Sequence, residues 1–374
     1  MAGRSQEALY AEIDLDLSWS ESDLPQTERT KHVHRLHPYL GKFIPQLVEI
    51  FLQRYFAPGA RVYDPFLGSG TTLVEANAFG IDSIGCDISA FNCLLSRVKT
   101  ENYSLATVEM ALRATLEQAR KDGPTDPQQA SAWLRSWYAP QALGELLGYR
   151  EAAAKLLDGP SHDVAMVILS RAARSARLTP HFDLEFPKQP VTEPYFCHKH
   201  KRVCRPVGEA GKFLNRYTTD TIRRIRHFAA VRTHCATDVI HADSRDVALP
   251  VRPTGIITSP PYPGLIDYHE QHRYSYELLG LEDKRTREIG AAEKGTSKRA
   301  IQAYADDMVS VFRRSLEQLP AGAPVVIVVN DSRTLYPEIL ERSGLVLDQR
   351  LTRHVNRRTG RRAGEFFEEV LVCR

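Results

Sequence analysis

The sequence has 374 residues, of which 43% are hydrophobic and 25% are charged, an ordinary composition for a soluble protein that can build a sizeable core. Its 49 basic and 46 acidic side chains leave a net charge of +3, so nucleic-acid binding cannot be argued from the total charge. No apolar run approaches the length of a membrane span, and six scattered cysteines form no disulfide framework. We expect an intracellular, cytoplasmic protein with reduced thiols and no membrane partner.

The first elements precede a nucleotide-type motif. Residues 1–30 are acidic and polar up to Asp23, and we interpret them as an N-terminal arm. From Ile44 to Tyr55 the apolar residues recur at helical spacing, with Pro45 in the first turn and Pro58-Gly59 ending the element. This helix is expected to cover one face of a sheet.

A strand, a glycine turn and a helix follow. The strand begins at Arg61 and reaches Asp64, the glycines stand at Gly68 and Gly70, and the helix begins near Thr71. Glycines let the backbone approach a ligand closely, and a helix N-terminus offers amide donors to an anionic group such as a carboxylate.

The next strand, residues 82–86, ends at Asp87. This residue lies 19 positions after Gly68, where nucleotide folds place a ribose-binding acid. The pattern indicates a nucleoside ligand. Because the loop lacks the third glycine that a pyrophosphate requires, NAD is not favoured.

The middle of the chain reads as largely helical. Ser89 is a credible cap for one helix, and further helices are predicted over residues 104–121, 128–157 and 161–177. Residues 179–211 are rich in Pro, Lys, His and aromatic residues and show no clear periodicity. We interpret residues 101–235 as an insertion between a first half, 31–100, and a second half, 236–374.

Sheet patterns resume in the second half, with strands predicted at residues 238–241, 255–258 and 325–329. Residues 345–351 and 365–372 predict a hairpin with the basic segment 357–362 at its tip.

The strand 255–258 runs into Ser259-Pro260-Pro261-Tyr262. Two prolines fix φ and remove two donors, so this turn is stiff and extended, and it holds a hydroxyl, two carbonyls and a phenol in fixed relation. A plain strand-ending turn explains the four residues equally well when they are taken alone.

Taken together, three segments resemble the amino-group DNA methyltransferases, and within them the N4-cytosine branch. Asp64 to Gly70 resembles that family's S-adenosylmethionine loop, Ser259 to Tyr262 its catalytic motif, and His37 to Gln46 the segment beside the methionine end of the cofactor. The three segments and their flanks cover about a third of the chain. The cofactor segments come first here, whereas many N4-cytosine enzymes have the opposite order.

The resemblance implies an α/β fold of the class I S-adenosylmethionine-dependent methyltransferases, a mostly parallel seven-stranded sheet with an antiparallel C-terminal hairpin. It implies S-adenosylmethionine as cofactor, with Asp64 and the amides of residues 66–70 at its amino-acid end, Asp87 at its ribose, and Asp243 at its adenine. The full expected cofactor set is Lys42, Phe43, Asp64, Pro65, Phe66, Gly68, Gly70, Thr71, Asp87, Ile88 and Asp243. For Phe43, plain core packing is an equal alternative, and Asp243 is explained as well by a helix cap.

The chemistry assigned to the Ser-Pro-Pro-Tyr turn follows from the weakness of an exocyclic amine as a nucleophile. Acceptors beside the amine favour a pyramidal nitrogen whose lone pair points at the sulfonium methyl. Ser259 Oγ and the Pro260 carbonyl are the expected acceptors, Pro261 keeps the turn rigid, and Tyr262 is expected to stack on a flipped cytosine. No Pro-Cys dipeptide occurs, which separates this pattern from C5-cytosine methylation. Serine rather than Asp or Asn at position 259 favours cytosine over adenine by resemblance.

The expected function is therefore site-specific N4-cytosine methylation of double-stranded DNA in a restriction-modification system of prokaryotic type, beside an endonuclease acting independently. The alternatives are guanosine-N2 methylation of RNA, adenine-N6 methylation of DNA, and a catalytically idle DNA-binding module. The insertion 101–235 is the candidate DNA-recognition region. Basic residues at 199–205, 223–226 and 357–362 could neutralise phosphates, although a solvated surface explains each cluster equally well.

Other clusters are not assigned to the site. Cys197, His198, His200 and Cys204 could bind zinc, but the spacing between the cysteines is longer than structural zinc sites usually show, so no metal is predicted. We interpret the histidines at 32, 34 and 37 as a DNA-facing or packing stretch. Residues 267–270 either line the base pocket or start a helix, and residues 290–299 are expected to form a mobile loop near the site that could close over DNA.

Overall fold

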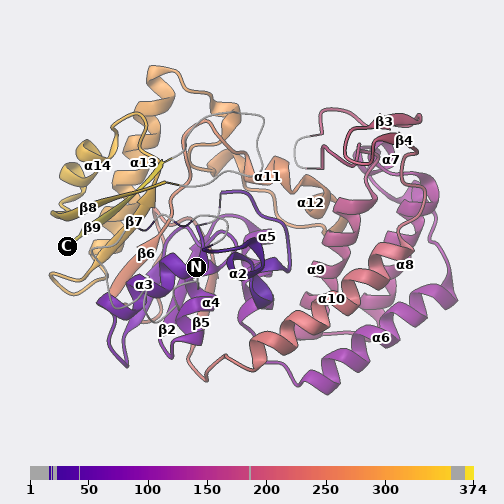
Figure 1. Ribbon diagram of the computed structural model, residues 1–374, viewed down its shortest axis with the longest axis horizontal. Helices are drawn as coiled ribbons and strands as arrows, with labels where there is room; N and C mark the ends of the chain where they lie inside the picture. Colours follow the sequence, from indigo (N-terminus) through magenta and orange to yellow (C-terminus); the bar gives the residue numbers. More distant parts are fainter. Residues whose placement is uncertain (1–16, 18, 20–22, 42, 185–186, 355–366) are drawn as a thin grey trace. The chain divides into compact units, whose positions relative to one another are not determined.

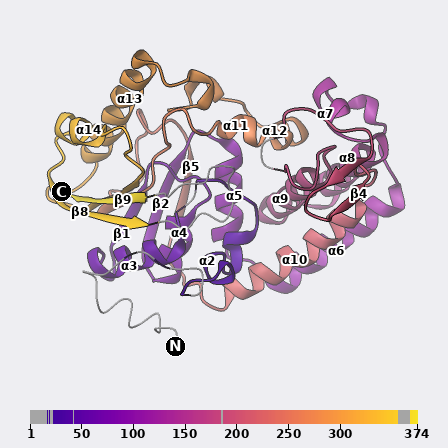
Figure 2. The same cartoon turned by 45° about the horizontal axis from the view of Figure 1, so that its top comes forward.

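The computed structural model describes residues 17, 19, 23–41, 43–184, 187–354 and 367–374, and it divides into two compact units. Unit 1 comprises Met1–Ser96, Val231–Asp267 and Lys284–Arg374, and unit 2 comprises Arg97–Ala230 and Tyr268–Asp283. Figures 1 and 2 show the elements of both units from two directions.

Unit 1 is built on one seven-stranded sheet. The strands are β1 (Arg61–Asp64), β2 (Asp82–Asp87), β5 (Thr237–His241), β6 (Gly255–Thr258), β7 (Val325–Val329), β8 (Leu347–His354) and β9 (Phe367–Cys373). Their spatial order is β5-β2-β1-β6-β7-β9-β8, and among these strands β9 alone runs in the opposite direction to the other six. The predicted class I methyltransferase architecture is confirmed. The strands of the predicted C-terminal hairpin are β8 and β9, while its basic tip lies outside the described residues.

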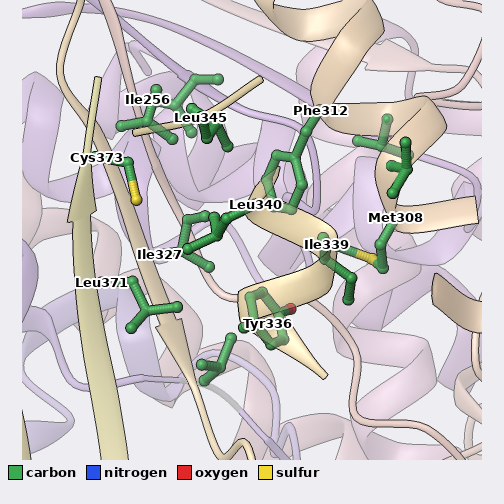
Figure 3. Packing of buried hydrophobic residues seen from close by; sticks show 14 of the residues in the cluster. Ile256, Met308, Phe312, Ile327, Tyr336, Ile339, Leu340, Leu345, Leu371 and Cys373 are labelled. Atoms are coloured by element: carbon green, nitrogen blue, oxygen red, sulfur yellow. The ribbon is translucent and has the colours of Figure 1, made fainter. Parts of the chain in front are cut away.

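Helices cover both faces of this sheet. On one face, α13 (Lys298–Leu316) and α14 (Tyr336–Ser343) pack on side chains that include Ile256, Ile327 and Leu371, as Figure 3 shows. On the other face, α3 (Pro45–Tyr55) and α4 (Thr71–Ala78) pack on Val62, Ile257 and the even-numbered valines of β7. Because β7 is buried on both sides, it reads in the sequence as an unbroken apolar run.

Several unit 1 elements were not predicted, although α3 and the helix after Ser89, α5 (Ala90–Thr100), were. Helix α13 begins inside the segment expected to be a loop, because Ser297 caps it by accepting the Ala300 amide. The remaining short elements of unit 1 are α2 (Gln26–Arg29), η1 (His32–Arg35), η3 (Arg285–Arg287) and η4 (Ala292–Lys294).

Unit 2 is mainly helical. Its helices are α6 (Leu105–Asp122), η2 (Pro127–Gln129), α7 (Ala132–Trp137), α8 (Pro140–Leu156), α9 (Gly159–Ala176), α10 (Gly211–Ala229), α11 (Tyr268–Gln271) and α12 (Arg273–Leu279). The helix predicted over 128–157 is broken between Trp137 and Pro140, where proline begins a new helix. The aperiodic segment contains a small antiparallel hairpin, β3 (Tyr195–Cys197) and β4 (Arg202–Cys204). None of the described helices is long and apolar enough to cross a membrane.

Candidate active site

The two predicted motifs meet at the carboxyl ends of adjacent parallel strands. β1 and β6 pair in the register Val62↔Gly255 and Tyr63↔Ile256, so the glycine loop after β1 and the Ser-Pro-Pro-Tyr turn after β6 begin side by side. The Thr258 hydroxyl donates a hydrogen bond of 2.7 Å to Asp64 Oδ1, and both side chains are fully buried. This bond joins the two motifs directly, although they are 194 residues apart in sequence.

Asp64 is a buried carboxylate, and one of its two oxygens has no hydrogen-bond partner among the described residues. Oδ1 also accepts the Phe66 amide at 3.1 Å, whereas Oδ2 is buried without a hydrogen-bond partner in the described part of the chain. Burial raises the pKa of Asp64 to about 6, and the hydrogen bonds, led by that from Thr258, only partly oppose this effect. An unpartnered buried carboxylate oxygen is costly, and a ligand that brings a donor or a cation would relieve that cost.

The glycine loop is shaped by the protein's own side chains. Gly68 and Gly70 have φ of +49° and +76°, which only glycine adopts without strain. A Cβ on Gly68 would lie 3.1 Å from the Tyr39 hydroxyl, and one on Gly70 would lie 2.6 Å from Ser96 Oγ. The close approach inferred from the sequence is therefore, in the structure, an approach of protein neighbours. Helix α4 starts at Thr71 without a side-chain cap, which leaves its positive N-terminal end available to an anion.

Asp87 holds this loop in place. Its Oδ2 accepts the Gly68 amide at 2.7 Å and Asn92 Nδ2 at 3.1 Å, and its Oδ1 accepts the Ser89 amide at 2.8 Å. Asn92 Nδ2 also lies 3.2 Å from the Tyr39 hydroxyl. Burial raises the pKa of Asp87 to about 6, against the opposing backbone hydrogen bonds. The sequence analysis did not identify Asn92 as part of the site. Its partner Tyr39 does lie in the segment, His37 to Gln46, that resembles the methyltransferase family.

The Ser-Pro-Pro-Tyr turn presents two unused acceptors. The Ser259 side chain is half-buried, and neither its hydroxyl nor the Pro260 carbonyl is hydrogen-bonded to any residue that the structure describes. By contrast, the Pro261 carbonyl accepts the Tyr304 hydroxyl at 3.0 Å, which ties the turn to α13. Tyr262 packs partly buried beside the core, with its hydroxyl 3.5 Å from Glu368 Oε1.

The other expected cofactor residues have varied surroundings. Asp243 pairs with Arg245 at 2.6 Å and Arg287 at 2.9 Å; burial alone would raise its pKa, but these arginines outweigh burial and lower it. The Pro65 carbonyl accepts the Ser244 hydroxyl at 2.5 Å, and the Ile88 carbonyl lies 3.0 Å from His241 Nε2. Phe43 is buried in the core beside α3. Lys42 lies outside the described residues.

The basic and histidine clusters differ in their partners. Arg223 and Arg224 pair with Asp220, and Arg226 pairs with Glu109, so each arginine of the 223–226 cluster has an acidic partner, which it shares with other arginines. His34 and His37 are buried, which supports packing rather than DNA contact for these two. Residues 268–271 form α11. The segment after residue 289 reaches the site region, since the Gly290 carbonyl accepts the Gly264 amide at 2.9 Å.

Comparisons with known proteins agree with this geometry. A family model described as a DNA methylase matches residues 6–97, which include the glycine loop. The type II methyltransferase M.MjaII from Methanocaldococcus jannaschii is 37% identical over an aligned length of 447 residues, covering 98% of this chain and 84% of that protein. The chain belongs to the amino-group DNA methyltransferase family. It is thus a DNA methyltransferase, and its cofactor is S-adenosylmethionine.

Other known proteins are less similar to this methyltransferase. M.MvaI from Kocuria varians is 39% identical over 77 residues, covering 20% of this chain and 17% of its own. M.BsoBI from Geobacillus stearothermophilus is 22% identical and covers 82% of this chain and 65% of its own. The solved structure of the rRNA methyltransferase AviRa from Streptomyces viridochromogenes is 14% identical, covers 95% of this chain and 93% of its own, and has a TM-score of 0.36.

The residues of the methyltransferase fit its cofactor. S-adenosylmethionine carries an ammonium, a carboxylate and ribose hydroxyls. The unpartnered Asp64 Oδ2 suits the ammonium, and the uncapped N-terminus of α4 suits the carboxylate. Among the described residues, Asp87 Oδ1 accepts only the Ser89 amide and can accept a further hydrogen bond, which suits a ribose hydroxyl.

Proposed function

We propose that this methyltransferase transfers the methyl group of S-adenosylmethionine to the N4 amino group of a cytosine flipped out of double-stranded DNA, as the modification enzyme beside an endonuclease that acts independently. The observation that carries the proposal is the pair of unused acceptors, Ser259 Oγ and the Pro260 carbonyl, on a turn hydrogen-bonded through Thr258 to the cofactor loop.

The two acceptors act on the amine's electronic state. The lone pair of the cytosine amino group is delocalised into the ring, so the nitrogen is planar and weakly nucleophilic. If each amino hydrogen is held by one acceptor, the nitrogen can become pyramidal and its lone pair is localised. The bound cofactor supplies the electrophilic sulfonium methyl. After transfer the cationic amine gives up one proton to solvent water.

The rigidity of the turn matters because the attack needs a near-attack geometry. Two prolines fix the backbone, Tyr304 holds the Pro261 carbonyl, and Thr258 is anchored on Asp64. A positioned acceptor loses little entropy when the base arrives. Tyr262 is proposed to stack on the flipped base, since aromatic stacking compensates for the stacking lost in the duplex.

The cofactor residues are proposed as a set. Asp64 would bind the ammonium, the amides of the 66–70 loop and α4 the carboxylate, and Asp87 the ribose hydroxyls. Asp243 would accept the adenine amino group by exchanging one of its contacts with Arg245 or Arg287, because these contacts occupy its four lone-pair sites. Lys42 and Phe43 are proposed beside the methionine end.

Adenine-N6 methylation is the second candidate, because the same two acceptors could hold an adenine amine. The serine at position 259 favours cytosine. Guanosine methylation in RNA loses support, since the family to which the chain belongs is described as DNA methylases.

One experiment separates the bases. The full chain is incubated with methyl-labelled S-adenosylmethionine and either duplex DNA or transfer RNA, and the products are digested to nucleosides and identified by mass spectrometry. We expect label in N4-methylcytosine from DNA. Label in N6-methyladenine would replace cytosine with adenine, and label confined to N2-methylguanosine would overturn the DNA assignment.

Replacing Ser259 by alanine tests the proposed acceptor. Ser259→Ala is expected to reduce kcat by about 100-fold or more, the usual effect of losing one group that stabilises a transition state. Binding of S-adenosylmethionine, measured by calorimetry, should stay within about twofold, because a twofold change is below 0.5 kcal/mol. Ser310→Ala, on the exposed face of α13, is the matched control. Full activity of Ser259→Ala would contradict the proposed role.

A further inference from the structure

Four soft metal ligands converge in unit 2, at the hairpin formed by β3 and β4. The ligand atoms of His181, Cys197, His200 and Cys204 all lie within 4.8 Å of one another. His181 comes from the segment after α9, Cys197 from β3, His200 from the turn, and Cys204 from β4. We propose that these four residues bind a structural zinc ion.

The distances fit a tetrahedral site. With Zn–S of about 2.3 Å and Zn–N of about 2.0–2.1 Å, the sulfur-to-nitrogen edge of a zinc tetrahedron is about 3.6 Å. His200 Nδ1 lies 3.6 Å from Cys197 Sγ and 3.5 Å from Cys204 Sγ. A neutral imidazole nitrogen has one hydrogen or one lone pair and cannot serve both sulfurs well by hydrogen bonding. A metal ion between the three atoms accounts for both distances.

The geometry of the hairpin explains why His200, and not His198, lies beside the two cysteines. In the turn, Lys201 adopts φ of +55° and its amide donates to the Cys197 carbonyl at 2.8 Å. This conformation places His200 over the cysteines. His198 instead packs against Phe182 and Phe196, with ring centroids 5.5 and 5.3 Å apart. His181 completes the set, with its ring centroid 4.8 Å from that of His200.

The position of His200 explains why the spacing between Cys197 and Cys204 did not predict a zinc site. The interval from Cys197 to Cys204 is long only if the cysteines are neighbouring ligands. His200 lies between them, so the successive spacings are two and three residues, which are ordinary for zinc knuckles. The fourth ligand, His181, precedes the hairpin and was not identifiable from local spacing.

A disulfide is the main alternative use of the two thiols. In the register of the hairpin, Cys197 pairs with Arg202 and Cys204 with Tyr195, so the cysteines form a diagonal pair on one face. Diagonal residues have Cα atoms about 7–8 Å apart, whereas disulfides need about 4.4–6.8 Å. The thiols are free in the structure, and both are buried.

The hairpin needs such an ion for its stability. Each strand has three residues, and an isolated two-stranded hairpin is marginal in water. Its other face offers little burial, because Phe196 and Val203, which lie opposite each other, are 53% and 66% exposed. With four protein ligands the ion has no open position for substrate, so its role is structural. A Cys₂His₂ donor set favours zinc over magnesium or calcium.

Metal content tests the site without reference to activity, so the result is independent of the proposed base specificity. The full-length protein, stripped with a chelator, is reconstituted with Zn²⁺, dialysed, and measured by plasma mass spectrometry. We expect one zinc per chain in the wild type, in Cys235→Ser and in His198→Ala, and none retained by Cys204→Ser or His181→Ala. Reconstitution with Co²⁺ should give the absorption of a tetrahedral thiolate site.

A second measurement uses only the wild-type chain, so it does not depend on variants that fold poorly. Zinc should slow proteolytic cleavage within residues 179–211 by about tenfold or more, because ligand binding suppresses local opening by mass action. The proposal is overturned if folded wild type takes up no zinc, if Cys204→Ser and His181→Ala retain it, or if mass spectrometry finds a disulfide between Cys197 and Cys204.

Discussion

Asp64 and Asp87 are carboxylates whose pKa burial raises to about 6, and both belong to the set of residues proposed to bind the cofactor. Folding raises these pKa values, so the ligand-free protein loses stability as the pH rises through the interval from about 4 to 6. The ionised forms suit the cofactor, because they accept from its ammonium and hydroxyl groups. Cofactor binding should therefore favour deprotonation.

We expect the affinity for S-adenosylmethionine to be constant above about pH 7 and to weaken by up to about tenfold per pH unit per carboxylate below pH 6. Calorimetric titrations between pH 5.5 and 8 measure this dependence. Asp64→Asn should remove the contribution of one carboxylate to this pH dependence, leaving that of Asp87, while weakening binding at pH 8. An affinity that does not change with pH would show that neither carboxylate contacts the cofactor.

Single residues were predictable from sequence only where a local motif marked them. Asp64 and Asp87 stand at strand ends next to a glycine loop, so the pattern identifies them. Thr258 and Asn92 act through hydrogen bonds whose value depends on which strands become neighbours. That information resides in the sheet order and not in the local sequence.

At the scale of elements, the start of α4 depends on Gly70. Its φ is +76°, and a Cβ would lie 2.6 Å from Ser96 Oγ on α5. Gly80, after the end of α4, has nearly the same φ, +75°, but nothing lies within 4 Å of its Cβ position. The two glycines therefore separate backbone strain from steric overlap.

Gly80→Ala should lower the free energy of unfolding by about 1–2 kcal/mol, the cost of a left-handed conformation for alanine. Gly70→Ala should lower it by about 1–3 kcal/mol more, because α5 must also shift. Denaturant unfolding monitored by circular dichroism gives both values. Equal losses for the two variants would mean that Ser96 yields at no cost.

Helices and strands, like single residues, were predictable from the sequence where a local pattern marks them. Strands β6 and β7 were identified because their apolar runs end in turns, and α3 because proline and glycine bound it. Helix α10 was missed because Gly211 and its charged residues resemble the loop before it. The long predicted helix was wrong at Tyr138 and Ala139, where the backbone is extended before Pro140.

At the scale of the whole molecule, a net charge of +3 hides an uneven distribution of available charge. Lys199, Lys201, Arg202 and Arg205 are exposed around the β3–β4 hairpin, and the structure shows no ion pair for them among the residues it describes. On α10, by contrast, Arg223 and Arg224 pair with Asp220 and Arg226 pairs with Glu109. We propose the hairpin as the phosphate contact of unit 2.

Lys199→Ala and Arg205→Ala should each reduce the slope of log affinity against log salt by about one, with weaker DNA binding at every sequence. Arg223→Ala is the matched control and should change the slope less, since Arg223 is paired with Asp220 whereas Lys199 and Arg205 have no ion pair among the described residues. Fluorescence anisotropy with duplex DNA at several salt concentrations measures this. If Arg223→Ala had the larger effect, α10 would replace the hairpin as the contact.

The two unused acceptors of the turn should also affect the release of methylated DNA. A cytosine amine has two hydrogens and can satisfy both Ser259 Oγ and the Pro260 carbonyl, but after methylation one hydrogen remains. One acceptor is then left without a donor, which costs about 1–3 kcal/mol when it is buried under the base. Methylated DNA would thus bind more weakly than unmethylated DNA. The same pair of acceptors that activates the amine would therefore promote product release.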